Sequence, residues 1–220
     1  MYSNRKSFDG SLQELKEKLL IMSSLAEKVL HDSVESLKKL DESLANEVIE
    51  LDDKLDKLEL EIDEFAIKLI TTQQPVAKDL RKIVSAIKIA SDLERIADLS
   101  VNIAKVTKRL KGQKLIKPLI DIPKMTETSQ KMLRTSMDAY VNEDIQMAKQ
   151  LAEMDDTIDH TYKLVLNELL EYMVKDSKLI DQGQQLGFVA RYIERIADHI
   201  TNIGESVIYL VSGERKILND

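Results

Sequence analysis

The stretch Glu94-Arg95-Ile96-Ala97-Asp98 recurs at a shift of 100 residues as Glu194-Arg195-Ile196-Ala197-Asp198, and Asn102-Ile103 recurs at the same shift as Asn202-Ile203. Residues nearer the start of each half recur at a shift of 103 instead. These residues are Leu30, Ser33, Asp41, Ala45, Glu50, Asp52, Asp53 and Asp56, which return as Leu133, Ser136, Asp144, Ala148, Glu153, Asp155, Asp156 and Asp159. The pattern therefore predicts two copies of one structural unit in tandem.

Each unit is predicted to contain three helices. Leu12, Leu15, Leu19, Met22 and Ala26 follow one another at steps of three or four, which places them on one face of a helix. The same spacing continues between the helix-breaking residues of the rest of the chain. We expect six helices, at about residues 8–39, 42–71, 75–110, 121–141, 144–174 and 177–212.

The helix boundaries follow from a few residues. Asp41, Asp144 and the pair Asp176-Ser177 are candidate N-caps, because short polar side chains accept hydrogen bonds from the first turn of a helix. Pro75 suits the first turn of the third helix, where its missing N–H costs nothing.

The breakers also divide the chain into two domains. Gly112, Pro118 and Pro123 cluster in the middle of the chain and mark the only good interdomain linker, at about residues 112–120. We therefore expect an all-α fold of two tandem three-helix bundles, residues 1–111 and residues 121–220, which pack on one another and share a core.

The composition excludes several classes of protein. With 6 Gly, 3 Pro and no Cys in 220 residues, the chain is poor in tight turns and has no disulfide, thiolate metal site or cysteine nucleophile. Six Tyr, three Phe, no Trp and a net charge of −7 argue against a nucleic-acid partner. No apolar run approaches the ~20 residues of a membrane span, and no apolar region typical of a secretory signal follows the first residues. We expect a cytoplasmic protein without a transmembrane segment.

Acidic residues recur between the halves more faithfully than apolar ones, and they form pairs four residues apart. At this spacing on a helix the Cβ atoms are about 5–6 Å apart, so like charges repel. Such pairs are typical of ligands awaiting a hard cation, Mg²⁺, Ca²⁺, Mn²⁺ or iron, and Zn²⁺ also fits. The pairs are Asp52 and Asp56, Asp155 and Asp159, Glu94 and Asp98, and Glu194 and Asp198.

The helical phase of the acids predicts their position and leaves a simpler explanation open. Those of the third and sixth helices lie opposite the apolar stripe, so we expect them at the bundle surface or in a groove between the two units. Acids in such a position can also be ordinary solvated side chains in weak ion pairs. The nearest candidates for such pairs are Arg81, Arg95 and Lys105.

Four segments together resemble the PhoU family of phosphate-uptake regulators. Gln74-Pro75-Val76-Ala77-Lys78-Asp79-Leu80-Arg81 with Asp92-Leu93-Glu94-Arg95-Ile96-Ala97-Asp98 resembles its first signature, and Arg191-Tyr192-Ile193-Glu194-Arg195-Ile196-Ala197-Asp198-His199 resembles its second. Glu50-Leu51-Asp52-Asp53-Lys54-Leu55-Asp56 and Glu153-Met154-Asp155-Asp156-Thr157-Ile158-Asp159 resemble its acidic helices. The resemblance covers essentially the whole chain, with Ala97 and Ala197 where the family usually has Gly.

The resemblance implies a metal-binding regulator that is not an enzyme. PhoU-like proteins are two three-helix bundles that can hold multinuclear iron or zinc clusters on E(D)xxxD pairs. They negatively regulate phosphate uptake and the phosphate regulon by linking the phosphate ABC transporter, through its ATPase, to a sensor histidine kinase. Carried over by position, the metal ligands are Glu94, Asp98, Asp52, Asp56, Glu194, Asp198, Asp155 and Asp159.

Other expectations complete this picture. Asp79 and Arg81 match a segment implied in signalling, and Asn102 and Asn202 are candidates beside the acids. Surplus apolar faces on the long helices favour a homodimer, attached to the membrane only through its partners. Which acidic helices pair with one another stays open.

Two alternatives compete with a metal-binding regulator. A ferritin-like di-metal enzyme needs Glu-x-x-His on two helices, but Ala97 and Ala197 stand three residues after the recurring glutamates. A helical adaptor that works without metal is the other alternative. The chain has no Gly-rich phosphate loop, GxSxG or HExxH motif, so we expect indirect sensing of phosphate and no catalysis.

Overall fold

The computed structural model describes residues 2–218, and side chains from residue 6 onward, so Met1 and residues 219–220 of the expected domain ranges lie outside it. All regular structure in the described part is helical, which confirms the all-α prediction. The elements are α1 (Tyr2–Lys39), α2 (Glu42–Gln73), α3 (Ala77–Arg109), α4 (Asp121–Asn142), α5 (Ile145–Lys175), the 3₁₀ turn η1 (Ser177–Leu179) and α6 (Ile180–Ser212).

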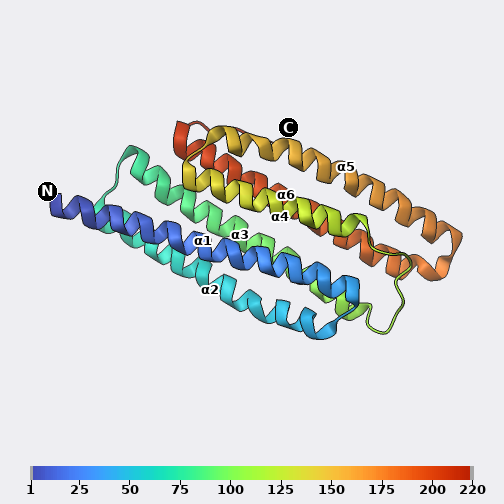
Figure 1. Ribbon diagram of the computed structural model, residues 1–220. Coiled ribbons are helices and arrows are strands. Elements are labelled where there is room, and N and C mark those ends of the chain that lie inside the picture. Colours follow the sequence, from blue (N-terminus) through green and yellow to red (C-terminus); the bar gives the residue numbers. More distant parts are fainter. Residues whose placement is uncertain (1, 219–220) are drawn as a thin grey trace.

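The six helices form two bundles that lie side by side along one long axis (Figure 1). We call α1–α3 repeat 1 and α4–α6 repeat 2. Contacts between the repeats run from α3 to α6 and from α1 to α4, whereas α2 and α5 contact only elements of their own repeat. The helices α2 and α5 therefore form opposite outer edges of the molecule, and α3 and α6 are central.

One continuous apolar core spans both repeats. The stripe of α3 that includes Ile89, Leu93 and Ile96 is fully buried, and so is the corresponding stripe of α6. A buried hydrogen bond from Ser85 Oγ to the carbonyl oxygen of Ser206 (3.1 Å) also joins α3 to α6. The repeats thus share a core, as expected from their small individual size.

Side-chain caps define two helix starts as predicted. Asp41 accepts from the backbone N–H of Leu44 at 3.1 Å, and Asp144 accepts from the N–H groups of Gln146 and Met147 at 2.8 and 3.1 Å. Both aspartates have extended backbones, as N-caps do.

Three other boundaries differ from the prediction. α1 begins at Tyr2, earlier than residue 8. α3 begins at Ala77 and leaves Pro75 outside, because α2 runs on to Gln73 and ends at Gln74, whose left-handed backbone (φ 46°) caps it. Before α6, Asp176 accepts from Lys178 N–H at 3.0 Å and so caps the 3₁₀ turn and not the α-helix itself.

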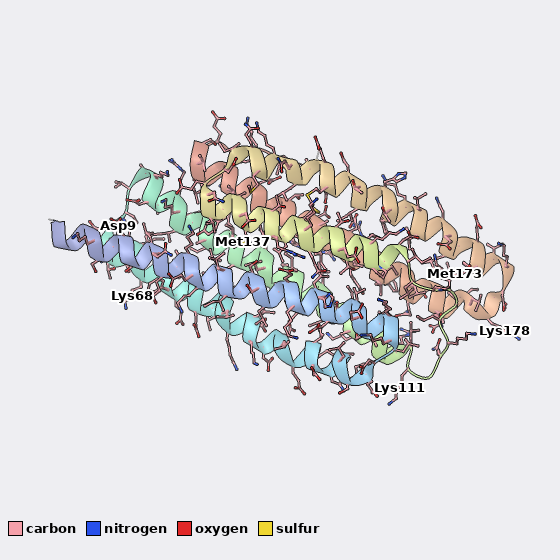
Figure 2. All side chains as sticks on the ribbon, in the orientation of Figure 1. Asp9, Lys68, Lys111, Met137, Met173 and Lys178 are labelled. Atoms are coloured by element: carbon pink, nitrogen blue, oxygen red, sulfur yellow. The ribbon has the colours of Figure 1, made fainter. Side chains whose placement is uncertain are left out.

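The segment between the repeats is attached to α6. Residues 110–120 contain no helix, and the buried side chain of Gln182 binds this segment at three points. Its Oε1 accepts from Ile116 N–H at 2.6 Å, and its Nε2 donates to Gln113 Oε1 and Lys114 O. The segment lies at the same end of the bundle as the α5–α6 turn, near the labelled Lys111, Met173 and Lys178 (Figure 2).

Within the described residues, none of the helices combines the length and the apolar character needed to cross a bilayer.

Candidate functional site

Repeat 1 brings four of the predicted acids together between α2 and α3. Burial, and after it the charges of Asp56 and Asp98, raise the pKa of Asp52. Burial, and after it the charge of Asp98, raises the pKa of Glu94 to about 7, with further contributions from Glu59 and Asp56. Since these couplings cross from one helix to the other, the two acid pairs form a single cluster.

Repeat 2 repeats this arrangement between α5 and α6. Burial, and after it the charges of Asp198 and Asp159, raise the pKa of Asp155 to about 7. Burial and the charge of Asp159 also raise the pKa of Asp198, and burial and the charge of Asp198 raise that of Glu194. The pairing that the sequence left open is therefore α2 with α3 and α5 with α6, within each repeat.

Each cluster contains two carboxylate oxygens that are buried and have no hydrogen-bond partner. They are Asp52 Oδ1 and Glu94 Oε2 in repeat 1, and Asp155 Oδ1 and Glu194 Oε2 in repeat 2. A buried polar atom without a partner costs about 1–3 kcal/mol. The same two positions recur in both repeats, although Glu94 Oε2 has the Arg95 guanidinium 3.3 Å away as an ion-pair partner. The recurrence indicates that Asp52 Oδ1, Asp155 Oδ1 and Glu194 Oε2 serve a partner that the chain itself does not supply.

The expected position of the acids of α3 and α6, at the bundle surface or in a groove between the two units, is wrong for Glu194, which is only 9% exposed. The Asp98 side chain is 40% exposed and does reach the surface. Asp155 of α5, for which no position was predicted, is 6% exposed. The reason is that α2 packs against α3 and α5 against α6, so a helix face opposite the apolar stripe is covered by a neighbour of the same repeat.

An arginine contacts the recurring glutamate in each cluster, but from a different position. In repeat 1, Arg95 Nη1 donates to Asp98 Oδ2 at 2.9 Å, and its Nε lies 3.3 Å from Glu94 Oε2. In repeat 2, Arg191 Nη1 donates to Glu194 Oε1. The counterpart of Arg95, Arg195, is exposed.

The donor set fits a hard cation. All eight candidate ligands are carboxylates, the groups that Mg²⁺, Ca²⁺, Mn²⁺ and iron prefer and that zinc also accepts. The buried unpartnered oxygens are unused acceptors of the kind that a cation satisfies. Among the side chains of residues 6–218, no group of three or more His, Cys, Asp or Glu is already placed to hold an ion.

Two acids of repeat 1 were not predicted to belong to the site. Glu59 and Asp63 continue the acidic face of α2, and burial raises the pKa of both, with the Asp63 charge as a second cause for Glu59. Asp63 Oδ1 is also buried and unpartnered. Their spacing from Asp56, three and then four residues, was the signal for them. They were missed because they do not recur in repeat 2.

The two residues matched to signalling lie at the end of the bundle where α3 begins. Asp79 is in the first turn of α3. Arg81 Nε donates to the carbonyl oxygen of Leu210 at 3.3 Å, in the last turn of α6. Arg81 therefore joins the repeats by binding a free C-terminal carbonyl, an interaction that also favours its positive charge.

The two candidate asparagines are not equivalent in their contacts. Asn102 is half-buried on α3. Asn202 Nδ2 donates to Asp92 Oδ1 at 3.2 Å, and His199 Nδ1 lies 3.0 Å from the same oxygen. Asn202 and His199 thus belong to a polar contact between α6 and α3 of the other repeat.

Known proteins resemble the chain over nearly its whole length. The PhoU domain family matches it twice, over residues 19–107 and 122–207. The phosphate-specific transport system accessory protein PhoU homologue of Clostridium acetobutylicum is 43% identical, with 98% of this chain and 99% of the relative covered. The homologue of the same name from Pseudomonas aeruginosa is 36% identical over 94% of this chain and 86% of the relative.

Two solved structures share the architecture. PhoU from Pseudomonas aeruginosa superposes with a TM-score of 0.90 at 36% identity, covering 94% of this chain and 100% of the solved chain. The phosphate transport system regulatory protein PhoU from Streptococcus pneumoniae gives 0.89 at 28% identity, covering 96% and 99%. With its two matched domains, its duplicated helical bundle and these relatives, the chain belongs to the PhoU domain family.

Proposed function

We propose that this protein is a metal-binding regulator that restrains phosphate uptake and the phosphate regulon, by linking the phosphate ABC transporter to a sensor histidine kinase. The similarity over nearly the whole chain to relatives named as accessory and regulatory proteins of phosphate transport supports the regulatory role. These names also support a role without catalysis.

Metal binding is supported by one observation, the buried unpartnered oxygens at equivalent positions of both repeats. One cation site would use Asp52, Asp56, Glu94 and Asp98, and the other would use the equivalent four acids of repeat 2. A bound cation would supply the positive charge that ionised carboxylates need in a half-buried place. Four carboxylates at each site are enough to bridge more than one ion, with iron or zinc first and Mg²⁺, Mn²⁺ or Ca²⁺ as alternatives.

The acids connect cation binding to the outer surface of the molecule. The helices α2 and α5 form the outer edges, and each provides half of one site. Without a cation, the carboxylates repel one another across the α2–α3 and α5–α6 boundaries. A cation turns this repulsion into attraction, and so changes the charge and the stability of the two helices that are most accessible to partner proteins.

The expected partners are the histidine kinase, the transporter ATPase and a second copy of this chain, all in the cytoplasm. Exposed apolar side chains support protein contacts of this kind: Leu170, Ile180 and Phe188 line a groove between α5 and α6. Light scattering during gel filtration tests the homodimer directly.

A complementation experiment tests the function. Deleting the gene should raise the expression of phosphate-starvation genes in phosphate-rich medium, and the parent allele should restore repression. The Asp98→Ala/Asp198→Ala allele should accumulate to the parent level but fail to restore repression. Unchanged expression in the deletion strain would contradict the regulatory role, whereas full repression by the variant would favour a metal-independent adaptor.

A further inference from the structure

An apolar groove lies between α5 and α6, at the end of the bundle where the labelled Met173 and Lys178 lie (Figure 2). It extends from Tyr162 to Met173 along α5 and from Ile180 to Arg191 along α6, and its volume is about 570 Å³. All of its lining residues belong to these two helices. A stretch of this length measures about 17 Å along a helix, so the groove is as long as three helical turns.

Two exposed apolar side chains flank the groove, one from each helix. Leu170 of α5 is 53% exposed, and Phe188 of α6 is 42% exposed. Exposed apolar side chains that gather in one place are typical of interaction surfaces. An occupant that covers both of them must be about as wide as a helix, whose axis lies about 8–10 Å from those of its neighbours. A single acyl chain is narrower than this.

Gly187 leaves space in the groove that the packing of repeat 2 does not require. A glycine in the interior of a helix is less stable than an alanine, so its presence needs a reason. At Gly183 the reason is internal, because a Cβ atom there would lie 2.7 Å from Met173 Cγ. At Gly187 a Cβ atom would lie 3.4 Å from Leu166 Cδ2, which is an ordinary van der Waals distance. The space beside Gly187 is therefore available to an occupant.

Repeat 1 fills the equivalent place. Ile87 stands where repeat 2 has Gly187, and its side chain packs against the core. Lys88 stands where repeat 2 has Phe188. The fold that the two repeats share therefore does not need the groove, which is a particular property of α5 and α6.

Positive charges lie at both ends of the groove. Lys163 and Arg191 are at one end and Lys178 is at the other, and all three are exposed. Arg191 also binds Glu194, where the carboxylate cluster of repeat 2 begins. In the described part of the chain, neither lysine side chain has an acidic partner.

The acids beside the groove are already engaged. Glu168 pairs with Lys117, Glu171 with Lys175 at 3.8 Å and Asp181 with Arg109 at 2.8 Å, and Asp176 caps the 3₁₀ turn. The charges of the rim that have no partner are thus positive, and they complement an acidic occupant.

We propose that this groove binds an amphipathic helix of a partner protein, which lays its apolar stripe between α5 and α6 and places acidic residues beside Lys163 and Lys178. The proposal rests on the protein contacts proposed above and specifies where one of them is made. Recognition of a helix in a groove uses apolar anchors spaced three or four residues apart. One anchor would occupy the space beside Gly187 and contact Phe188.

Fluorescence anisotropy with a designed peptide tests this occupant. The probe is a fluorescein-labelled amphipathic helix of about 18 residues, with leucines on one stripe and glutamates beside it. A second probe has lysines in place of the glutamates. The parent should bind the acidic probe at least about tenfold more tightly than the basic one. The net charge of the chain, −7, favours the opposite order, so this preference would be a local effect of the groove.

Substitutions locate the binding site on the protein. Phe188→Lys, which introduces the residue of repeat 1, and Gly187→Leu, which fills the groove, should each weaken binding of the acidic probe at least about tenfold. Ile67→Lys is the matched control, because Ile67 is the counterpart of Leu170 on α2 and is 57% exposed. It should leave the affinity unchanged. Circular dichroism monitors folding, and Phe188→Lys keeps the test decisive if Gly187→Leu does not fold.

The outcomes separate the possible occupants. Equal binding of the two probes, or equal effects of Phe188→Lys and Ile67→Lys, would overturn the proposal. A parent dimer that Phe188→Lys converts to a monomer in light scattering would assign the groove to a second copy of the chain and overturn a partner helix. Displacement of the bound probe by palmitate alone, at equimolar concentration, would assign it to an acyl chain. The peptide result decides the groove even if deleting the gene leaves expression unchanged, since that outcome contradicts only the regulatory role.

Discussion

Replacing Asp155 by asparagine should make the metal-free protein more stable and the metal-loaded protein less responsive. Asp155 is 6% exposed, its Oδ1 has no partner, and its pKa is raised from 3.8 to about 7 by burial and neighbouring carboxylates. At about 1.4 kcal/mol for each pKa unit, ionising this group in the folded protein costs about 4 kcal/mol above pH 7. Because its neighbours share the titration and relax when one charge is removed, we expect asparagine to recover about half, ~2 kcal/mol.

The pH dependence of this effect has a definite sign. Between pH 3.8 and about 7 the folded protein keeps a proton on Asp155 that the unfolded chain has lost. The folded state therefore binds more protons, and the free energy of unfolding falls as the pH rises through this window and levels off above it. The amide of the Asp155→Asn protein does not titrate, so the gain in stability should be larger at pH 8 than at pH 5.

Thermal unfolding followed by circular dichroism at pH 5 and pH 8, with EDTA or with zinc, measures both effects. For a chain of this length ~2 kcal/mol corresponds to about 4–8 °C in Tm. A cation at about 100 times its Kd should add about 2.7 kcal/mol to the parent, and less to Asp155→Asn because one site loses a ligand. The exposed neighbour gives a matched control, Asp156→Asn, which should change Tm little in either condition. A Tm for Asp155→Asn at or below that of the parent at pH 8 in EDTA would refute the reasoning.

Three further predictions test other parts of the structure. The Asp98→Ala/Asp198→Ala protein should fold and lose most of its bound metal, because the two substitutions remove one carboxylate from each cluster. Mass spectrometry after gel filtration measures the metal content per chain. Equal metal in parent and variant would reject both residues as ligands. Arg81→Ala should lower the free energy of unfolding by about 1 kcal/mol and speed amide exchange in the last turn of α6, where Leu210 loses its donor; unchanged exchange there would contradict the contact. Gln182→Ala removes three hydrogen bonds to the linker, so it should lower the free energy of unfolding by about 1–3 kcal/mol and speed proteolysis at residues 112–117. A cleavage rate equal to that of the parent would show that the linker is held by other contacts.

The sequence predicted the fold well, because the information for it is local. The recurrence of Asp41 as Asp144 marks equivalent helix starts, and both residues are caps in the structure. Pro75 was placed inside α3 because proline suits a first helical turn, but the preceding helix extends further and uses Gln74 as its cap. Propensity alone does not tell which of two neighbouring helices takes the boundary residues.

The site was predictable in its residues and not in its surroundings. Internal recurrence identifies Asp155 and Glu194, and the helical phase shows that Glu194 lies opposite the apolar stripe of α6. The phase of one helix does not show that another helix covers the side opposite its apolar stripe. The burial of Asp155 and Glu194 could therefore not be predicted. Glu59 and Asp63 follow the same acidic spacing, but a comparison of the two halves cannot identify residues that are present in only one of them.

The antiparallel contact of α3 with α6 has a consequence for the history of such a chain. A protein made of one repeat would expose to water the face of α3 that meets α6, where Ser85 is fully buried and bonded to Ser206 here. Two such proteins could cover it for each other only as a symmetric pair, because equivalent helices meet in opposite directions (Figure 1). In a symmetric pair every substitution appears twice, and encoding both halves in one gene removes this constraint. Ser91 in one half and Arg191 at the equivalent position of the other are a divergence that only a fused pair can acquire.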